Sequence, residues 1–188
     1  MGIIRIMSKI ISKNVTSAEN QQERLGKVWW IVGFVDGEGT FSVSLFRNKK
    51  AKLGWQCFPE FVVTQGVKSY SALLAIKEFF GCGNIYINNR YDNHRENLAR
   101  YCVRSVNDLT EVIIPFFNEF KLKTAKDVDF KKFSQIIELM KEKRHLISSG
   151  LEEIAGIISV MNHQKQSNYL ESSEAIRRDL LLENSLNK

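Results

Sequence analysis

The helical pattern from Glu23 to Asp36 constrains the fold more than any other segment, because it is apolar on nearly every face. A helix of this kind must be covered on nearly every side. Small residues and one tryptophan make a stripe along it, namely Gly26, Trp30, Gly33 and Gly37. Because glycines let two helices cross closely, we expect the chain's own core on one side and a second chain on the other. The alternative is a central core helix in a monomer.

Two carboxylates, Asp36 and Glu38, end this segment. Acidic side chains at a close helix crossing can hold a divalent metal, since such cations prefer oxygen ligands. A carboxylate at the carboxyl end of a helix is disfavoured by the helix dipole, and a nearby cation would compensate. These residues predict a dimer with its chemistry at the twofold axis. The alternative is that Glu38 is an ordinary surface acid at a helix end.

The hydrophobic period changes from 3.6 to 2 after Gly39, which predicts strands rather than further helix. Two predicted hairpins supply four strands, near residues 41–46, 56–64, 84–90 and 98–104. Helices are predicted over 69–80, 105–120 and 126–144, and a capping box of Ser149 and Glu152 predicts a last helix that ends near Asn162. This order predicts an α+β fold in which helices cover one face of a four-stranded antiparallel sheet.

The other face of this sheet would be open. Alternation assigns these side chains to it: Ser42, Ser44, Phe46, Gln56, Phe58, Glu60, Val62, Thr64, Tyr86, Asn88, Arg90, Arg100, Cys102 and Arg104. Ile87 is expected on the helix-covered face. Arginine and amide side chains can read base edges, and the candidates for that role are Asn88, Arg90, Arg100 and Arg104. The alternative is a solvated face, which is normal for antiparallel sheets.

The charge balance favours polyanionic partners. Against 21 Asp and Glu the sequence has 27 Lys and Arg, and its pI is about 9.2, so nucleic acid is the first partner to test. The charged turn after the first strand contains Arg47, Lys49, Lys50 and Lys52, which we expect to hold phosphates. No apolar run is long enough to predict a membrane span. Residues 1–15 fit either an organellar presequence or an N-terminal extension.

Residues 31–39, Ile-Val-Gly-Phe-Val-Asp-Gly-Glu-Gly, resemble the signature of the LAGLIDADG homing endonuclease family. Other segments are similar to the family's strands, turns and last helices in the same order. They are residues 61–65, 79–85, 114–117, 121–124 and 151–154. The resemblance covers residues 25–162, and the ordered set of segments is more specific than the signature alone.

The resemblance implies an α-β-β-α-β-β-α core whose sheet forms a saddle on double-stranded DNA. It also implies a metal-dependent double-strand break at a long pseudo-palindromic site, with Mg²⁺ or Mn²⁺ as cofactor and an intron-encoded gene. With one motif in the sequence, the family works as a homodimer. The endonuclease domain would span residues 23–162, between an extension at 1–22 and a polar tail or short helix at 163–188. The compartment would be an organelle, or alternatively the bacterial or archaeal cytoplasm.

The resemblance assigns roles at the end of the apolar helix. Glu38 matches the carboxylate that holds the metal, and the Gly37 carbonyl matches a second ligand. Asp36 matches the residue that caps the paired helices, and Gly33 and Trp30 lie in the interface between them.

Further roles fall outside this helix. Gln65 matches a strand-end residue that positions water or contacts the scissile phosphate. Lys123 matches the active-site lysine, which would polarise water or offset developing charge, and Lys121 is its competitor. A second basic residue of the family falls at Ser69, so we expect the neighbouring Lys68 to replace it.

Two other functions fit the same resemblance. The first is an RNA-binding maturase that aids splicing of its own intron. The second is a noncatalytic dimeric protein that binds DNA. Cleavage is favoured over both because Glu38, Gln65 and Lys123 are all present.

Overall fold

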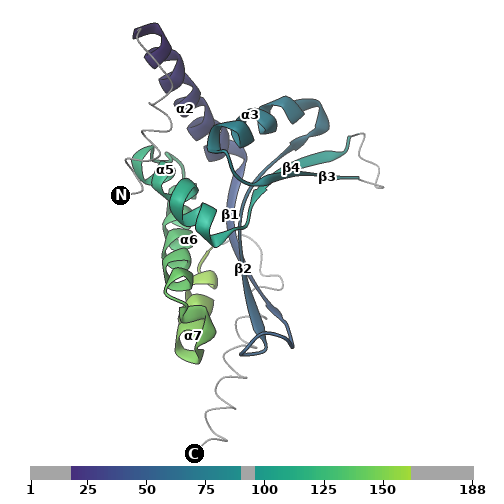
Figure 1. Cartoon of the computed structure of the whole chain (residues 1–188), viewed down its shortest axis with the longest axis vertical. Helices are drawn as coiled ribbons and strands as arrows, with labels where there is room; N and C mark the ends of the chain where they lie inside the picture. The colour runs from purple at the N-terminus through teal and green to yellow at the C-terminus, as the bar shows by residue number, and fades with distance from the viewer. Residues whose placement is uncertain (1–17, 90–95, 162–188) are drawn as a thin grey trace, which may run out of the picture. The chain divides into compact units, whose positions relative to one another are not determined.

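Figure 1 shows the computed structural model of the chain, which describes residues 18–89 and 96–161. The chain divides into two compact units. Unit 1 contains the chain up to Thr40 together with Phe61–Asp127, and unit 2 contains Phe41–Glu60 and the chain from Val128 onward. Each unit is described below by itself.

Unit 1 begins with the long helix α2 (Ala18–Glu38), which starts earlier than the predicted Glu23. Its other elements follow in chain order. They are the end of β2 (Trp55–Gly66), the 3₁₀ turn Val67–Ser69, α3 (Tyr70–Phe80), β3 (Asn84–Asn88), β4 (Leu98–Val103), α4 (Val106–Asp108), the π-helical turn Leu109–Ile113 and α5 (Ile114–Glu119). Ser105 caps α4, since its Oγ accepts a hydrogen bond from Asp108 N at 3.2 Å.

Unit 2 contains most of β1 (Gly39–Arg47) and the first half of β2, which form the predicted first hairpin. Its helical elements are most of α6 (Lys126–Lys141), the 3₁₀ turn Arg144–Leu146 and α7 (Ser148–Ile158). The expected order of helices and strands is confirmed. In the part of the chain that the structure describes, no helix is both long and apolar enough to cross a lipid bilayer.

The four strands pair in one sheet in the order β1-β2-β4-β3. Within unit 1, β4 pairs antiparallel with β2 from Phe61↔Val103 to Gly66↔Leu98, and with β3 from Asn84↔Cys102 to Asn88↔Leu98. The α+β fold with a four-stranded antiparallel sheet is therefore confirmed. Pro59 lies in the half of β2 that β4 does not reach, where its missing N–H leaves no gap in that pairing.

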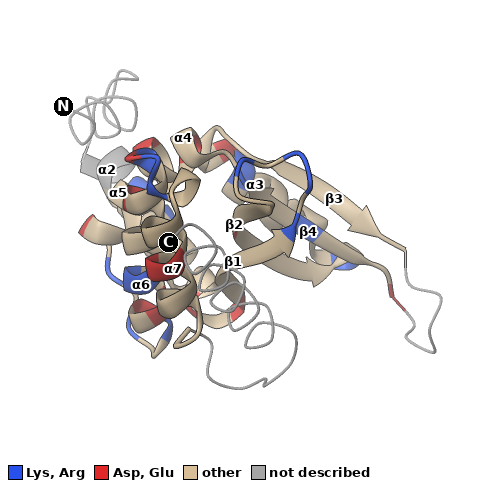
Figure 2. Cartoon of the chain, turned by 90° about the horizontal axis from the view of Figure 1, so that it is seen from below, with Lys and Arg blue, Asp and Glu red and all other residues tan. Residues whose placement is uncertain are grey.

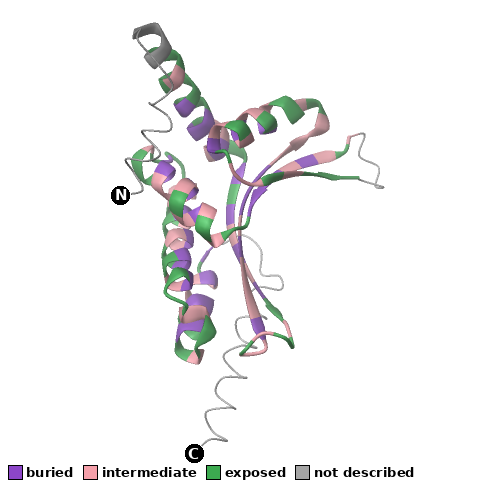
Figure 3. Ribbon diagram, in the orientation of Figure 1, coloured by how far each residue is buried: buried purple, intermediate pink, exposed green. Residues whose placement is uncertain are grey.

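An aromatic cluster forms the core of unit 1 (Figure 3 shows the buried residues in purple). Phe61 packs edge-on against Phe80 and Phe117, with ring centroids 6.3 and 5.8 Å apart. Tyr101 of β4 is fully buried beside them, and its hydroxyl donates to Cys82 O at 3.1 Å. The cluster joins α3 and α5 to the inward side of β2 and β4, so it holds the strand that carries Gln65.

Unit 2 has a core of its own. Phe41 of β1 packs against Phe130 and Phe133 of α6, with ring centroids 5.1 and 5.5 Å apart. Cys57 of β2 donates its thiol hydrogen to the Met140 sulfur at 3.4 Å. Burial raises the pKa of Cys57 to about 12, so this thiol stays protonated and acts as a core residue.

Three side chains differ from the alternation expected for the sheet. Val62 and Cys102 were expected on the open face, but they are cross-strand partners and only 5% and 3% exposed. Both lie on central strands, since β2 and β4 each have a neighbouring strand on both sides. Ile87 was expected to be buried, yet it is 55% exposed. It lies on β3, an edge strand that has a neighbour on one side alone.

The predicted capping box of Ser149 and Glu152 is wrong. Helix α7 begins at Ser148, and its cap residue Ile147 makes no side-chain hydrogen bond to the helix. The reason is tertiary: a Cβ on Gly150 would lie 2.2 Å from Arg144 O, so the first turn of α7 packs directly on the preceding 3₁₀ turn. That contact, rather than a serine cap, places the start of the helix.

Candidate active site

The carboxyl end of α2 turns sharply into β1, and glycine makes the turn possible. A Cβ on Gly39 would lie 2.6 Å from Val35 Cγ1 and 2.7 Å from Val35 O. Any larger residue would push the strand away from the helix end. The two carboxylates Asp36 and Glu38 immediately precede this turn, within unit 1.

Asp36 is fully engaged with the segment that follows α5. One carboxylate oxygen accepts the Lys123 N–H at 2.8 Å, and the other accepts the Thr124 N–H at 3.2 Å and the Thr124 hydroxyl at 2.6 Å. Leu122, the residue before, is buried and anchors the same segment. Asp36 therefore fastens residues 122–124 to the helix end.

The pKa of Asp36 reports the same engagement. Burial acts to raise it, but the hydrogen bonds from Thr124 and Lys123 and the charge of Lys126 outweigh burial, so the pKa lies below its ordinary value. Asp36 is thus held as an anion whose oxygens already have partners. This favours the expected capping role over metal binding.

Lys126 is the functional candidate that sequence reasoning missed. Its Nζ donates to Val35 O at 3.0 Å and to Gly37 O at 3.2 Å. Burial lowers the pKa of Lys126, while the charges of Asp36 and Glu38 act to raise it. The available signal was its place at the start of the helix predicted from residue 126, immediately after the segment similar to the family's active-site lysine.

The expected active-site lysine, Lys123, is placed differently. Its backbone N–H contacts Asp36, whereas its side chain is exposed and makes no hydrogen bond or ion pair in the described part of the chain. Lys121, the competitor, is also exposed. The structure thus brings the backbone of Lys123 to the site and the ammonium of Lys126 to the carbonyl groups.

Glu38 lies at the tip of the helix and is exposed. Its carboxylate makes no hydrogen bond or ion pair with any described residue, although its charge acts on Lys126. The donor set fits a hard cation: one carboxylate lies beside a backbone carbonyl that already attracts an ammonium group. Among residues 18–89 and 96–161, no cluster of three His, Cys, Asp or Glu could by itself enclose a metal ion. Besides the Glu38 carboxylate, a bound cation would need other oxygen ligands, such as backbone carbonyl groups, phosphate oxygens or water.

Gln65 and Lys68 lie at the end of β2, in the same unit. Gln65 is half-buried, opposite Ala99 of β4, and its amide makes no hydrogen bond with a described residue. Lys68 is exposed, and its backbone N–H donates to Glu96 Oε1 at 2.7 Å. A Cβ on Gly66 would lie 2.6 Å from that carboxylate, so the Glu96 side chain packs closely on the backbone of this turn. No hydrogen bond or ion pair among the described residues joins either side chain to Glu38.

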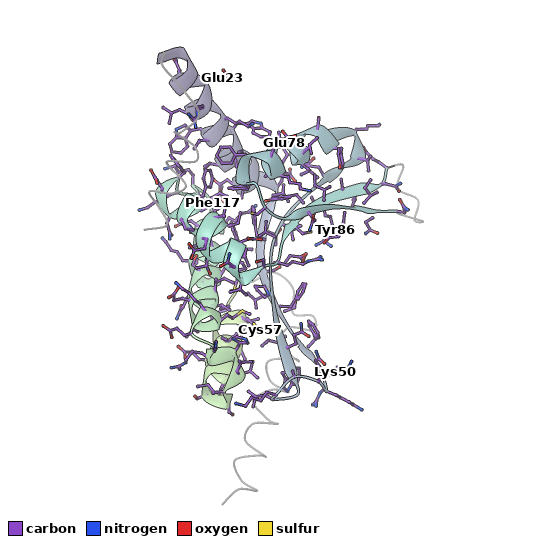
Figure 4. All side chains as sticks on the ribbon, viewed as in Figure 1. Glu23, Lys50, Cys57, Glu78, Tyr86 and Phe117 are labelled. Carbon is purple, nitrogen blue, oxygen red and sulfur yellow. The ribbon has the colours of Figure 1, made fainter. Side chains whose placement is uncertain are left out.

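The turn of the first hairpin, in unit 2, presents its lysines to solvent. Asn48 organises the turn: its Oδ1 accepts from Lys50 N at 3.0 Å, and its Nδ2 donates to Gln56 Oε1 at 2.7 Å. Lys49, Lys50 and Lys52 are exposed, and Figure 4 shows Lys50 at the end of the hairpin. Gln56, a candidate for base contact, instead serves the turn.

Other candidate DNA-binding residues of unit 2 interact with one another. Arg47 lies over the Trp55 ring at 4.8 Å, and the exposed Phe46 packs against Phe58 with ring centroids 6.2 Å apart. Ser42 Oγ donates to Glu60 O at 3.5 Å. Ser44 and Glu60 are half-buried.

In unit 1, the expected outward side chains lie on β3, β4 and the end of β2. Arg104 lies over the exposed Tyr86 ring at 5.1 Å, and Thr64 is paired opposite Arg100. Asn88 is exposed. Tyr86 is labelled beside β3 in Figure 4, and basic positions are blue in Figure 2. Arg90 lies outside the described residues.

The glycine stripe of α2 faces open space. An added Cβ would meet nothing within 4 Å at Gly26, Gly33 or Gly37. Trp30, in the same stripe, is 41% exposed and packs on Phe34 with ring centroids 5.4 Å apart. Val35, by contrast, is fully buried. Among residues 18–89 and 96–161, therefore, only one side of this apolar helix is covered.

Relatives of this chain share its sequence over much of its length. The profile of the LAGLIDADG endonuclease family matches residues 31–137. A Neurospora crassa protein named "Probable intron-encoded endonuclease 3" is 33% identical over 135 residues, which are 71% of this chain and 24% of that protein. The chain spans about a quarter of the length of this relative and of two other curated relatives that it matches.

Solved structures agree in fold. The homing endonuclease I-TnaI has a TM-score of 0.70 and 37% identity, covering 80% of this chain and 97% of that one. The I-SmaMI LAGLIDADG homing endonuclease, solved with cleaved DNA, has a TM-score of 0.70 and 34% identity, covering 80% of this chain and 48% of that one. With its signature helix, its sheet and a profile match over more than half of its length, the chain belongs to the LAGLIDADG endonuclease family.

Proposed function

We propose that this chain is an intron-encoded, site-specific endonuclease that makes a metal-dependent double-strand break in a long, pseudo-palindromic DNA site. The observation that carries the proposal is the tip of α2. There Glu38 is exposed, and the carbonyl group of the preceding Gly37 accepts a hydrogen bond from the Lys126 ammonium group. Asp36, by contrast, accepts a hydrogen bond from the backbone of Lys123 and so fastens that segment to the helix. The relatives named as intron-encoded endonucleases, and the related structure solved with cleaved DNA, support the same substrate class.

The residues divide the work of phosphodiester hydrolysis among them. A bound Mg²⁺ or Mn²⁺ would neutralise charge on the scissile phosphate and activate a water molecule. Glu38 and the Gly37 carbonyl would hold that cation. Gln65 would orient the attacking water through its amide, which has no other partner in the described chain. Lys123 and Lys126 would offset the negative charge that develops on the phosphate.

The open glycine stripe supports a homodimer. Two copies of α2 that cross at Gly33 and Gly37 would cover Trp30 and bring both Glu38 side chains to one axis. This would place a second carboxylate beside the metal ion. Gly33→Leu tests the interface, because the folded monomer has room for the new side chain. We expect sedimentation equilibrium to give a monomer for this variant and a dimer for the wild type, and circular dichroism to show that the variant is folded.

DNA contacts would divide between the two units. Lys49, Lys50 and Lys52 of the hairpin turn would bind phosphates without reading sequence. In unit 1, Arg100 and Asn88 on neighbouring strands would read base edges. An organellar gene remains our prediction for the origin of the chain, supported by the intron-encoded relatives.

The decisive experiment uses DNA that spans the insertion site of the gene's own intron in an intron-less copy. We expect the wild type to cut both strands in Mg²⁺ and to be inactive in EDTA. Glu38→Gln keeps the size of the side chain and removes its charge, so it should bind the same DNA without cutting it. Glu142→Gln, at an exposed acid in unit 2, is the matched control and should cut normally. Normal cleavage by Glu38→Gln would contradict the assignment.

A further inference from the structure

Lys126 donates a hydrogen bond to a carbonyl oxygen that the proposed metal ion would also use as a ligand. Its ammonium group donates to the carbonyl oxygens of Val35 and Gly37, at 3.0 and 3.2 Å. The Gly37 carbonyl is the second ligand in the proposed function, on which this inference rests. The same atom is thus shared between a cation that belongs to the chain and one that must come from solution.

The contact is with the carbonyl groups rather than with a carboxylate. Lys126 makes no ion pair with Glu38 among the described residues, although the charges of Asp36 and Glu38 both act on it. Carbonyl groups at the carboxyl end of a helix carry partial negative charge and attract any cation. A divalent ion at Gly37 would place two positive groups around one oxygen, where like charges repel.

We propose that Lys126 competes with the metal ion for the Gly37 carbonyl. In the metal-free protein its ammonium group fills this position and weakens metal binding, and it must leave the carbonyl when the ion binds. The simpler view, that Lys126 only caps α2, predicts the opposite result for its removal. Loss of a cap would loosen the helix end and weaken metal binding.

The test measures Mn²⁺ binding without DNA, from the electron paramagnetic resonance signal of the free ion. Lys126→Met keeps the length of the side chain and removes its charge. Lys141→Met is the matched control, because Lys141 belongs to the same helix α6, is exposed, and pairs with Glu138 at 3.8 Å. We expect Lys126→Met to bind Mn²⁺ about tenfold more tightly than the wild type, a usual size for coupling between two sites. Lys141→Met should bind as the wild type does.

Equal or weaker Mn²⁺ binding by Lys126→Met would overturn the competition. If Mn²⁺ binds, is lost in Glu38→Gln and is unchanged in Lys126→Met, the competition fails while the proposed nuclease stands. If none of these proteins binds Mn²⁺, the competition also fails, and the cleavage assay decides separately about the nuclease.

A second measurement needs only the wild type and so does not depend on a variant that folds. The ammonium resonances of ¹⁵N-labelled lysine are followed by NMR during a Mg²⁺ titration, and Lys126 is assigned by its absence in Lys126→Arg. We expect the Lys126 resonance to shift as Mg²⁺ binds, while that of Lys123 stays in place. An unmoved Lys126 resonance at saturating Mg²⁺ would show that the ammonium does not leave the carbonyl groups.

Discussion

Charged side chains are used in opposite ways in the two compact units. In unit 1, Asp36 accepts three hydrogen bonds from residues 123 and 124, and Lys126 donates to two backbone carbonyl groups. In unit 2, Lys49 and Lys50 stand exposed on a hairpin turn whose shape is set by Asn48 instead. The hydrogen bonds in unit 1 fix the positions of the site's atoms, whereas the lysines of the hairpin turn present positive charge to solvent.

This difference predicts which part of the molecule tolerates amino-acid substitutions. A site that depends on hydrogen bonds of defined length loses function when one atom moves, because reacting groups must be aligned. A phosphate-binding turn depends mainly on the number of positive charges, so its losses are gradual and follow the salt concentration. Three predictions test this contrast.

The largest effect is expected for Asp36→Ala in unit 1. The change leaves two backbone N–H groups and one hydroxyl without their acceptor, and it should lower the free energy of unfolding by about 2 kcal/mol. DNA cleavage should fall about 100-fold, because the segment that carries Lys123 is no longer fastened to α2. Urea denaturation and cleavage kinetics measure the two effects.

Thr124→Val is the matched control for Asp36→Ala. It removes the hydroxyl donor and leaves both backbone donors to Asp36, so its loss of stability should be about 1 kcal/mol. Equal losses in the two variants would mean that the carboxylate contributes nothing beyond this one bond, and that unit 1 does not depend on the network.

A smaller and salt-dependent effect is expected in unit 2. Changing Lys49, Lys50 and Lys52 together to Gln should weaken DNA binding and reduce the slope of log affinity against log salt by about 5.4, if each of the six lysines in the proposed homodimer neutralises one phosphate. The rate of cleavage of bound DNA should stay the same. Fluorescence anisotropy over a series of salt concentrations measures the slope.

The control for the hairpin removes the same net charge elsewhere, through Gln at Lys27, Lys77 and Lys141. An equal change of slope in this control would show that the hairpin lysines act only through the overall charge of the protein. A fall in the cleavage rate of bound DNA by the hairpin variant would break the contrast between the units.

The smallest effect concerns pH. Burial lowers the pKa of His145 in unit 2 below the ordinary value of 6.5, although its contact with the Met140 backbone acts to raise it. Below that pH the unfolded chain takes up a proton that the folded chain resists, so His145 makes the protein less stable as pH falls from 6.5. His145→Gln should lose less stability than the wild type between about pH 7 and about pH 5.5. Parallel curves of unfolding free energy against pH would contradict this.

Much of the fold could be predicted from local patterns. The change from period 3.6 to period 2 at Gly39 placed the first hairpin, and the helix predicted from residue 105 begins as α4 does, after Ser105. These signals work because a helix or strand buries one side of itself, whatever it packs against. The expected assignments of Val62, Cys102 and Ile87 failed where burial followed the strand's place in the sheet rather than alternation.

The candidate site likewise has features that the sequence predicts and features that depend on the tertiary structure. The sequence alone determined that two carboxylates follow an apolar glycine-containing helix, and the family resemblance predicted different roles for Asp36 and Glu38. Only the tertiary structure decided how they differ. Asp36 meets backbone N–H groups 87 and 88 residues away in the chain, and Lys126 meets the carbonyl of Gly37. Such contacts leave no periodic trace in the sequence, because they are made by backbone atoms that every residue carries.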